Sequence, residues 1–294
     1  MKQIRNNLFI LKECKIGELT SSIYLLNTES EDGLILIDTG FNFEFEREMK
    51  QIGINPRNIK HCLITHGHYD HVDGCKALFK INTKIRFYAH QEDSETTELI
   101  VNNDKNLNFT VTDRFKEKIS NLKLGKYSIS CIHIPGHSPG GMAYFSKIEN
   151  KDVLFAGDIC GGAVKNGGDY EAFKKSLQEL LELKADILCD GHMNIIQPSE
   201  EVSKYIEGCL EINEYLHIGI DIDPNDSTNW YNLALVSYQL KIYDNAYKAC
   251  LYTLHLDENN LKAKQLRKRI LKHTPSKIIE DIMSEFGEYS RLEK

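Results

Sequence analysis

The sequence lacks a long hydrophobic run, since no stretch approaches the ~20 apolar residues that a membrane-spanning helix requires. Near the N-terminus, the apolar run Leu8–Leu11 is far shorter than the roughly 7–15 residues of a signal-peptide core. A CxxC pair is also missing, and the 8 cysteines are scattered through 294 residues. This distribution indicates reduced thiols rather than a disulfide framework. We therefore expect a cytoplasmic protein that is not embedded in a membrane.

An excess of positive charge is likewise absent, because the formal net charge is -7 at pH 7. Proteins that bind nucleic acids use basic clusters to neutralise phosphates, so we expect no nucleic-acid partner. The one basic cluster, Lys262–Lys272, is predicted to be the solvated face of a helix.

The composition is that of a globular protein, with 41% hydrophobic and 27% charged residues. A chain of 294 residues exceeds what one hydrophobic core usually organises, which leaves room for a main domain and an appendage. Up to about residue 200, short apolar strands alternate with helices, as in a layered α/β domain. Beyond that point only helical patterns occur, so we predict a boundary between residues 200 and 215.

Side chains that can bind metals follow the ends of four predicted strands. The segment THGHYDHVDG, residues 65–74, comes at the end of a strand predicted over 62–65. His137, Asp158 and His192 each follow a later strand, and a crossover helix is predicted over 169–183 between the last two. Side chains at strand ends of α/β domains converge on ligands, so we expect these residues to meet.

The number of candidate ligands favours two metal ions. Zinc binds neutral imidazoles and carboxylates in tetrahedral sets, and a catalytic site keeps one position for water. Seven ligands are too many for one such ion and suit two ions that share a carboxylate. The candidates are His66, His68, Asp70, His71, His137, Asp158 and His192.

The motifs THGHYDH, PGHSPGG, FAGD and CDGH follow LIDTG in this order, and in this they resemble the metallo-β-lactamase superfamily of hydrolases. The resemblance covers about residues 1–200. It implies an α/β fold, the αββα sandwich, as a catalytic domain over residues 1–205. Residues 206–294 would then form a C-terminal all-helical extension.

The resemblance also implies roles for individual residues. His66, His68 and His137 would bind one metal, Asp70, His71 and His192 the other, and Asp158 would bridge both. Asp38 would orient ligands without binding metal. The implied cofactors are two divalent ions, zinc foremost, with iron or manganese as alternatives.

The implied reaction is hydrolysis, in which a hydroxide that bridges the metals attacks the carbonyl of a small-molecule thioester, ester or lactone. Asp158 would hold the metal pair, and a protonated Asp70 or a metal-bound water would assist the leaving group. Cys160 is interpreted as a packing residue. Lys165, in a glycine-rich loop, is a candidate substrate contact.

Fold alone does not identify the substrate, so absent features are used to select among the superfamily's activities. The predicted cytoplasmic location argues against a β-lactamase, and the acidic chain against a nuclease. His68 stands where flavin-linked di-iron members have a carboxylate, and Gly161 where lactonases often have a tyrosine. The glyoxalase II-like group, which acts on thioesters or activated esters, remains. Two alternatives stay open: a mononuclear iron persulfide dioxygenase, and an adaptor that acts through its tail.

The tail resembles a tetratricopeptide repeat over residues 224–259. Ile222 and Leu256 occupy equivalent positions at a spacing of 34, the period of that helix-turn-helix unit. A lone unit cannot bury both faces of its helix pair, because such arrays need about three repeats. We therefore expect the tail to pack on the catalytic domain, on a second copy of the chain in a homodimer, or on another protein.

Overall fold

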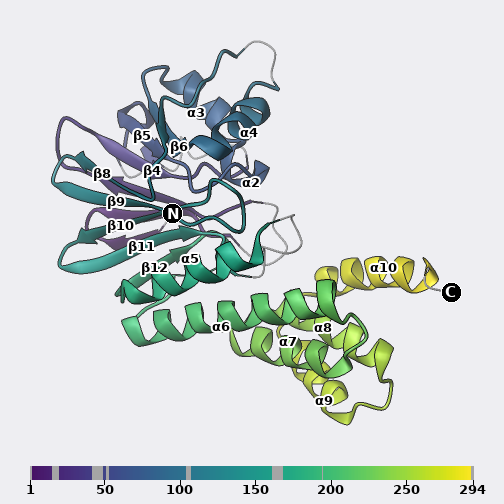
Figure 1. The fold of residues 1–294 in the computed structure, drawn as a ribbon. Helices are drawn as coiled ribbons and strands as arrows, with labels where there is room; N and C mark the ends of the chain where they lie inside the picture. The colour runs from purple at the N-terminus through teal and green to yellow at the C-terminus, as the bar shows by residue number, and fades with distance from the viewer. Residues whose placement is uncertain are drawn as a thin grey trace. The chain divides into compact units, whose positions relative to one another are not determined.

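The computed structural model describes residues 2–14, 20–41, 49–50, 53–103, 107–160, 168–193 and 195–292. By internal contacts the chain divides into two units, residues 1–204 and 205–294. Two β-sheets lie in the first unit (Figure 1). The described part of the second unit contains helices and the turns that connect them, and no strand.

The first sheet has seven strands in sequence order, antiparallel up to β4 and parallel from β4 to β7. Its strands are β1 (Lys2–Arg5), β2 (Leu8–Lys12), β3 (Ile23–Asn27), β4 (Leu34–Ile37), β5 (Ile59–Leu63), β6 (Arg86–His90) and β7 (Asp113–Phe115). All four residues of β4 are buried, as expected of a strand covered on both faces. The strand predicted over 62–65 begins earlier and ends at Leu63, so Thr65 already belongs to the loop.

The second sheet has five strands in the order β12-β11-β10-β9-β8. They are β8 (Ile119–Leu124), β9 (Tyr127–His133), β10 (Met142–Ile148), β11 (Lys151–Gly157) and β12 (Ile187–Asp190). Only β11 and β12 are parallel, and helix α5 (Tyr170–Glu182) connects them. The predicted crossover helix is thus confirmed, and Asp169 caps its N-terminus by accepting from the N–H of Ala172.

Helices cover the outer faces of the two sheets, which pack against each other (Figure 1). Besides α5, the unit contains α2 (Tyr69–Val72), α3 (Cys75–Ile81), α4 (Gln91–Val101) and the 3₁₀ turn η1 (Pro56–Asn58). One core contains residues of both sheets, such as Tyr24 and Phe155, and another contains residues of the first sheet and its helices, such as Phe87 and Leu78. The expected αββα sandwich is confirmed.

Two buried tyrosines connect the sheets at the edge where the candidate ligands lie. The Tyr144 hydroxyl of β10 donates to the carbonyl oxygen of Ile64 at 2.6 Å. The Tyr24 hydroxyl of β3 donates to the carbonyl oxygen of Asp190 at 2.7 Å. Each bond fixes the backbone immediately before a ligand-bearing loop of the other sheet. The sandwich therefore positions its loops by direct polar contacts as well as by packing.

The helical elements after β12 are α6 (Ser199–His217), the π-helical turn η2 (Ile218–Ile222), α7 (Ser227–Gln239), α8 (Tyr243–Leu256), α9 (Leu261–Ile270) and α10 (Ser276–Leu292). Helices α7 and α8 pack on each other within the segment that resembles a tetratricopeptide repeat, and its assignment to that family stays a prediction. The basic residues of α9 are exposed while Ala263, Leu266 and Ile270 are buried, which confirms a solvated basic face.

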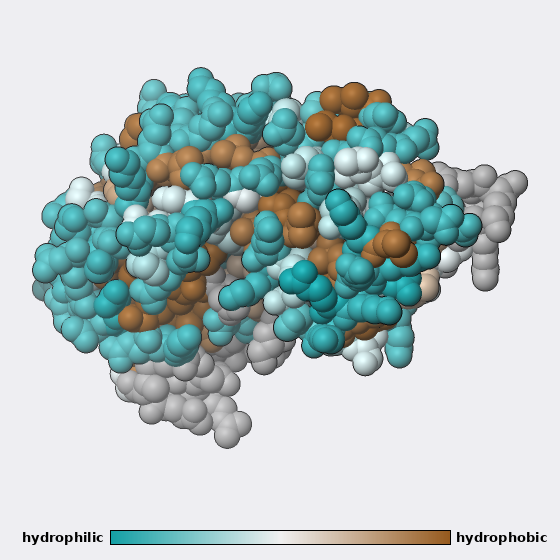
Figure 2. All heavy atoms as spheres, turned by 90° about the horizontal axis from the view of Figure 1, so that it is seen from below, coloured by the Kyte–Doolittle hydropathy of each residue, from teal (hydrophilic) through white to brown (hydrophobic). Residues whose placement is uncertain are grey.

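Hydrophilic side chains predominate on the face shown in Figure 2, where hydrophobic residues form separate areas. No helix in the described part of the chain is both long enough and apolar enough to cross a bilayer.

We predict that Trp230→Ala lowers the free energy of unfolding of the helical unit by about 3 kcal/mol, the usual cost of deleting a large buried aromatic side chain. Trp230 is 7% exposed and stacks on Tyr252 at 4.7 Å between ring centroids, and its indole N–H donates to the Pro224 carbonyl at 2.9 Å. Urea denaturation monitored by circular dichroism measures the change. The control Leu261→Ala removes a side chain that is 70% exposed and should change stability by no more than about 0.5 kcal/mol.

Candidate metal centre

The predicted ligands come from four loops at one edge of the sandwich. His66 and His68 lie in the loop after β5, and Asp70 and His71 in the short helix α2 that follows it. The remaining three follow the C-terminal ends of β9, β11 and β12, and they are His137, Asp158 and His192. The structure brings all seven together, as the distances below show.

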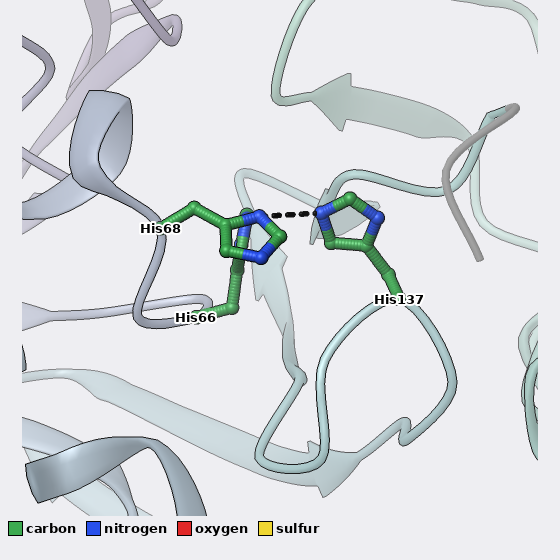
Figure 3. A group of neighbouring side chains, drawn as sticks. All are labelled: His66, His68 and His137. Atoms are coloured by element: carbon green, nitrogen blue, oxygen red, sulfur yellow. Dashed lines mark hydrogen bonds between the residues drawn. The ribbon is translucent and has the colours of Figure 1, made fainter. Parts of the chain in front are cut away.

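The first group consists of three histidines (Figure 3). His68 Nδ1 lies 3.0 Å from His66 Nε2 and 2.9 Å from His137 Nε2. Burial lowers the pKa of His66 well below its usual value and that of His137 to about 4, so both rings are neutral. A neutral imidazole offers one lone pair to a metal, and ligand nitrogens of a tetrahedral zinc lie ~3.3 Å apart. The three nitrogens are therefore close to the spacing that one cation requires.

The second group consists of Asp70, His71 and His192. His71 Nε2 and His192 Nε2 are 3.3 Å apart. Asp70 Oδ2 lies 3.1 Å from His192 Nε2 and 3.7 Å from His71 Nε2. This group also matches the spacing of ligands around one cation.

Asp158 lies between the two groups. Its Oδ2 is 3.5 Å from His137 Nε2 and 3.1 Å from His192 Nε2, and its Oδ1 is 3.2 Å from His71 Nε2. The Oδ1 atom is buried but has no hydrogen-bond partner of good geometry. A buried carboxylate oxygen without such a partner is costly, and a bound cation would satisfy it. The residues present thus fit a pair of metal ions.

Neighbouring carboxylates raise the pKa values of the two histidines in the second group. Burial alone would lower the pKa of His71, but Asp158 and Asp38 outweigh it and raise that pKa to about 10. The pKa of His192 is also raised, because Asp158 outweighs the effect of burial. Burial would raise the pKa of Asp158, yet these two histidines lower it well below its usual value. Without metal, the positive imidazoles therefore balance the buried carboxylate.

Asp38 supports His71 in the manner that the resemblance implied. It is 2% exposed, and its Oδ2 accepts from His71 Nδ1 at 2.8 Å and from Thr65 Oγ1 at 2.7 Å. The backbone N–H of Thr65 donates to Asp38 Oδ1 at 2.8 Å. Because Nδ1 is engaged by the carboxylate, Nε2 of His71 is directed at the other ligands. Thr65 was not predicted, since its role depends on contacts that its position in the motif does not indicate.

Two further residues near His192 were missed by sequence reasoning. Asp190 Oδ1 accepts from the backbone N–H groups of His192 at 2.8 Å and Met193 at 3.0 Å, and burial raises its pKa to about 6. Cys14 Sγ lies 3.5 Å from His192 Nδ1. Asp190 stands inside the motif CDGH, which could have identified it. No sequence signal connects Cys14 with His192, because they are far apart in the chain.

The remaining predicted residues stay outside these groups. Cys160 is half-buried and belongs to none of the candidate metal groups among the described residues, and Lys165 lies outside those residues. A separate group contains His90, Glu92 and His133. The rings of His90 and His133 stack in parallel, 3.7 Å apart at 7°. A metal lies in the plane of each imidazole that binds it, so parallel rings cannot both bind one ion in this arrangement.

Comparisons with known proteins agree with this architecture. A family model described as the metallo-beta-lactamase superfamily matches residues 16–192, a range that includes every candidate ligand. The hydroxyacylglutathione hydrolase GloC of Haemophilus influenzae is 30% identical over 173 residues, covering 54% of this chain and 79% of that protein. The probable metallo-hydrolase YqgX of Bacillus subtilis is 30% identical over 179 residues, covering 56% and 81%. Among solved structures, a mutant of the metallo-beta-lactamase FEZ-1 from Legionella gormanii is similar, with a TM-score of 0.59 at 20% identity, covering 74% of this chain and 94% of that one.

We predict that Gly191→Ala weakens metal binding at least ~10-fold, within the range seen when groups that support metal ligands are disturbed. A methyl group at residue 191 would lie 2.3 Å from Asp158 Oδ1 and 3.0 Å from His71 Cε1, so the carboxylate must leave its position between the two groups. Metal content after dialysis against a graded chelator series measures the effect. Gly287→Ala is the matched control, because nothing lies within 4 Å of the added methyl group there. If both variants retain the same amount of metal, the position of the Asp158 carboxylate does not matter for metal binding and the prediction is wrong.

Proposed function

The chain belongs to the metallo-beta-lactamase superfamily, and on this basis we propose that it is a dinuclear metal-dependent hydrolase of thioesters or activated esters. The supporting observation is that two groups of three potential ligands lie on either side of one carboxylate, that of Asp158. His66, His68 and His137 would hold one divalent ion, and Asp70, His71 and His192 the other, with Asp158 between them. Zinc is the proposed metal, since neutral imidazoles and carboxylates suit it.

When bound, the two cations supply Lewis acidity, which lowers the pKa of water and polarises a carbonyl group. The chain's own residues determine where this occurs. Asp158, whose side chain is 15% exposed, places negative charge between the two groups. Asp38 holds the His71 ring through Nδ1, which fixes the direction of Nε2.

Two alternative proton donors to the leaving group were predicted, a protonated Asp70 and a metal-bound water. Burial would raise the pKa of Asp70, but the hydrogen bond from His192 and the charge of His71 together lower it. The surroundings of Asp70 therefore favour an ionised carboxylate, which acts as a ligand. A proton for the leaving group then has to come from elsewhere, and water is the simplest donor.

The thioester class rests on the relatives. The Haemophilus influenzae protein is a hydroxyacylglutathione hydrolase, and hydroxyacylglutathione is a thioester. The similar β-lactamase structure is 20% identical, a level at which it supports the fold alone. The alternative, a mononuclear iron persulfide dioxygenase, keeps the same motif, and imidazoles and carboxylates also bind iron, so the metal content per chain separates the two functions.

We predict that protein purified without added metal contains two zinc ions per chain and that Asp158→Ala loses cooperative binding of the pair. Removing the carboxylate leaves two neighbouring cations without the charge that screens their repulsion. Hydrolysis should fall at least ~100-fold. Elemental analysis and metal titration provide the measurement, and Asp281→Ala removes an exposed carboxylate as the control. One iron per chain in a fully active protein would favour the dioxygenase instead.

A further prediction is that acyl thioesters are hydrolysed with a higher kcat/KM than β-lactams. The reason is the 30% identity shared over 173 residues with the hydroxyacylglutathione hydrolase of Haemophilus influenzae. A side-by-side comparison of an acylglutathione and a cephalosporin tests it. A better cephalosporin substrate would contradict the thioester assignment and leave the dinuclear hydrolase intact.

A further inference from the structure

A single buried carboxylate on α4 connects two of the ligand-bearing loops. Asp93 lies in the first turn of that helix and is 4% exposed. Its Oδ2 accepts from the backbone N–H of Gly67 at 2.9 Å and from the hydroxyl of Ser138 at 2.7 Å. Its Oδ1 accepts from the backbone N–H of Gly140 at 2.8 Å. Hydrogen bonds to a charged acceptor are among the stronger ones in proteins.

In the sequence, these three donors lie within three residues of the histidines of the first group. Gly67 stands between His66 and His68, and Ser138 directly follows His137. The two loops come from different sheets, since one follows β5 and the other connects β9 with β10. Asp93 therefore fixes the distance between the loops on which His66, His68 and His137 converge.

The loops approach Asp93 so closely that one of them requires glycine. A methyl group at residue 140 would lie 2.6 Å from the Asp93 backbone nitrogen and 2.7 Å from its Cγ. Such distances are shorter than any ordinary contact, so a side chain there would separate the loop from the helix. The absence of a side chain at Gly140 thus lets its N–H reach Asp93 Oδ1.

The second loop has additional support beside Asp93. His133 Nε2 donates to the carbonyl oxygen of Pro139 at 2.8 Å, while the carbonyl oxygen of Gly141 accepts from the N–H of Ile134 at 2.7 Å. These bonds fix the ends of the loop to its own strands. Two contacts connect it with the loop of His66 and His68: the Met142 N–H, which donates to the Thr65 carbonyl at 2.7 Å, and Asp93, which bonds directly beside the three histidines.

We propose that Asp93 is a positioning residue that sets the spacing of His66, His68 and His137 and thereby the affinity of this group for its metal ion. The inference rests on the proposed function, because it presupposes that these histidines bind a metal. Asp93 acts through backbone and hydroxyl groups and is not itself a ligand. The second group has different supports, namely Asp38 for His71 and Asp190 for the backbone at His192.

The substitution Asp93→Asn tests the proposal with little change of shape. An amide has one acceptor oxygen where the carboxylate has two, so at least one of the three donors must face an NH₂ group. We expect one of the two metal equivalents to bind about 10–100-fold more weakly, as is typical when a group that orients ligands is altered. The other equivalent should change less than about threefold. Titration of metal-free protein with Zn²⁺ against a chromophoric chelator measures both.

Three variants make the comparison specific. His137→Ala removes a ligand of the first group and identifies which equivalent belongs to it. Glu95→Gln neutralises an exposed carboxylate on the same helix and should leave both affinities unchanged. Ser138→Ala removes one of the three hydrogen bonds and should weaken the same equivalent by a smaller factor than Asp93→Asn. Circular dichroism of each metal-free variant reports whether it is folded, and Ser138→Ala remains the test if Asp93→Asn does not fold.

The outcomes separate the two proposals. If the wild type binds two ions and Asp93→Asn binds one of the two equivalents more weakly, both the dinuclear function and the positioning role are supported. Two ions with neither equivalent weakened, or with both weakened alike, overturns the positioning role, since a general loss of stability would not select one group. If the wild type binds a single ion, the dinuclear function is contradicted. The positioning role then stands only if Asp93→Asn lowers the affinity for that ion.

Discussion

Negative charge held in a mostly buried place is the constraint around which this protein is organised. Asp38 and Asp190 are each 2% exposed, and the side chain of Asp158 is 15% exposed. Neighbouring carboxylates in such surroundings repel one another and need nearby positive charge. Without metal, His71 and His192 provide it, as the raised pKa values of both show. Divalent cations can take the same place, and the histidines then serve as neutral ligands.

The two sheets meet at the point where this charge is concentrated. Tyr24 and Tyr144 each donate a hydrogen bond from one sheet to a carbonyl of the other, immediately before a ligand loop. The N–H of Met142 donates to the carbonyl of Thr65 at 2.7 Å, and that of Gly191 to the carbonyl of Gly157 at 2.8 Å. Ligands from loops far apart in the chain therefore share one rigid frame. Rigid support matters here because a catalytic metal needs its ligands in a fixed geometry.

The candidate ligands were easier to predict than the residues that contact them. Imidazoles and carboxylates at strand ends are recognisable by residue type and spacing, so all seven residues that the structure brings together could be named as candidates. Asp38 could be named only through the resemblance. Thr65 and Cys14 have side chains common in any core, and their contacts with Asp38 and His192 exist only once separate strands are folded together. The layered α/β class followed from alternating strands and helices, and the αββα order followed from the resemblance. The end of β5 was misplaced because Ile64 and Thr65 are β-branched residues typical of strands, yet they lie beyond the paired strand.

Metal ligands and the residues that support them have different physical consequences. The ligands determine which metals bind and what chemistry those metals supply. The supports hold the ligands in position and so affect the dissociation constant, Kd, of the cation. A cation that binds only the native state adds RT ln(1 + [L]/Kd), about 2.7 kcal/mol at a hundredfold excess over Kd. Because His66 and His137 come from different sheets, a cation bound by both would hold the sandwich together at the edge where the carboxylates otherwise repel one another.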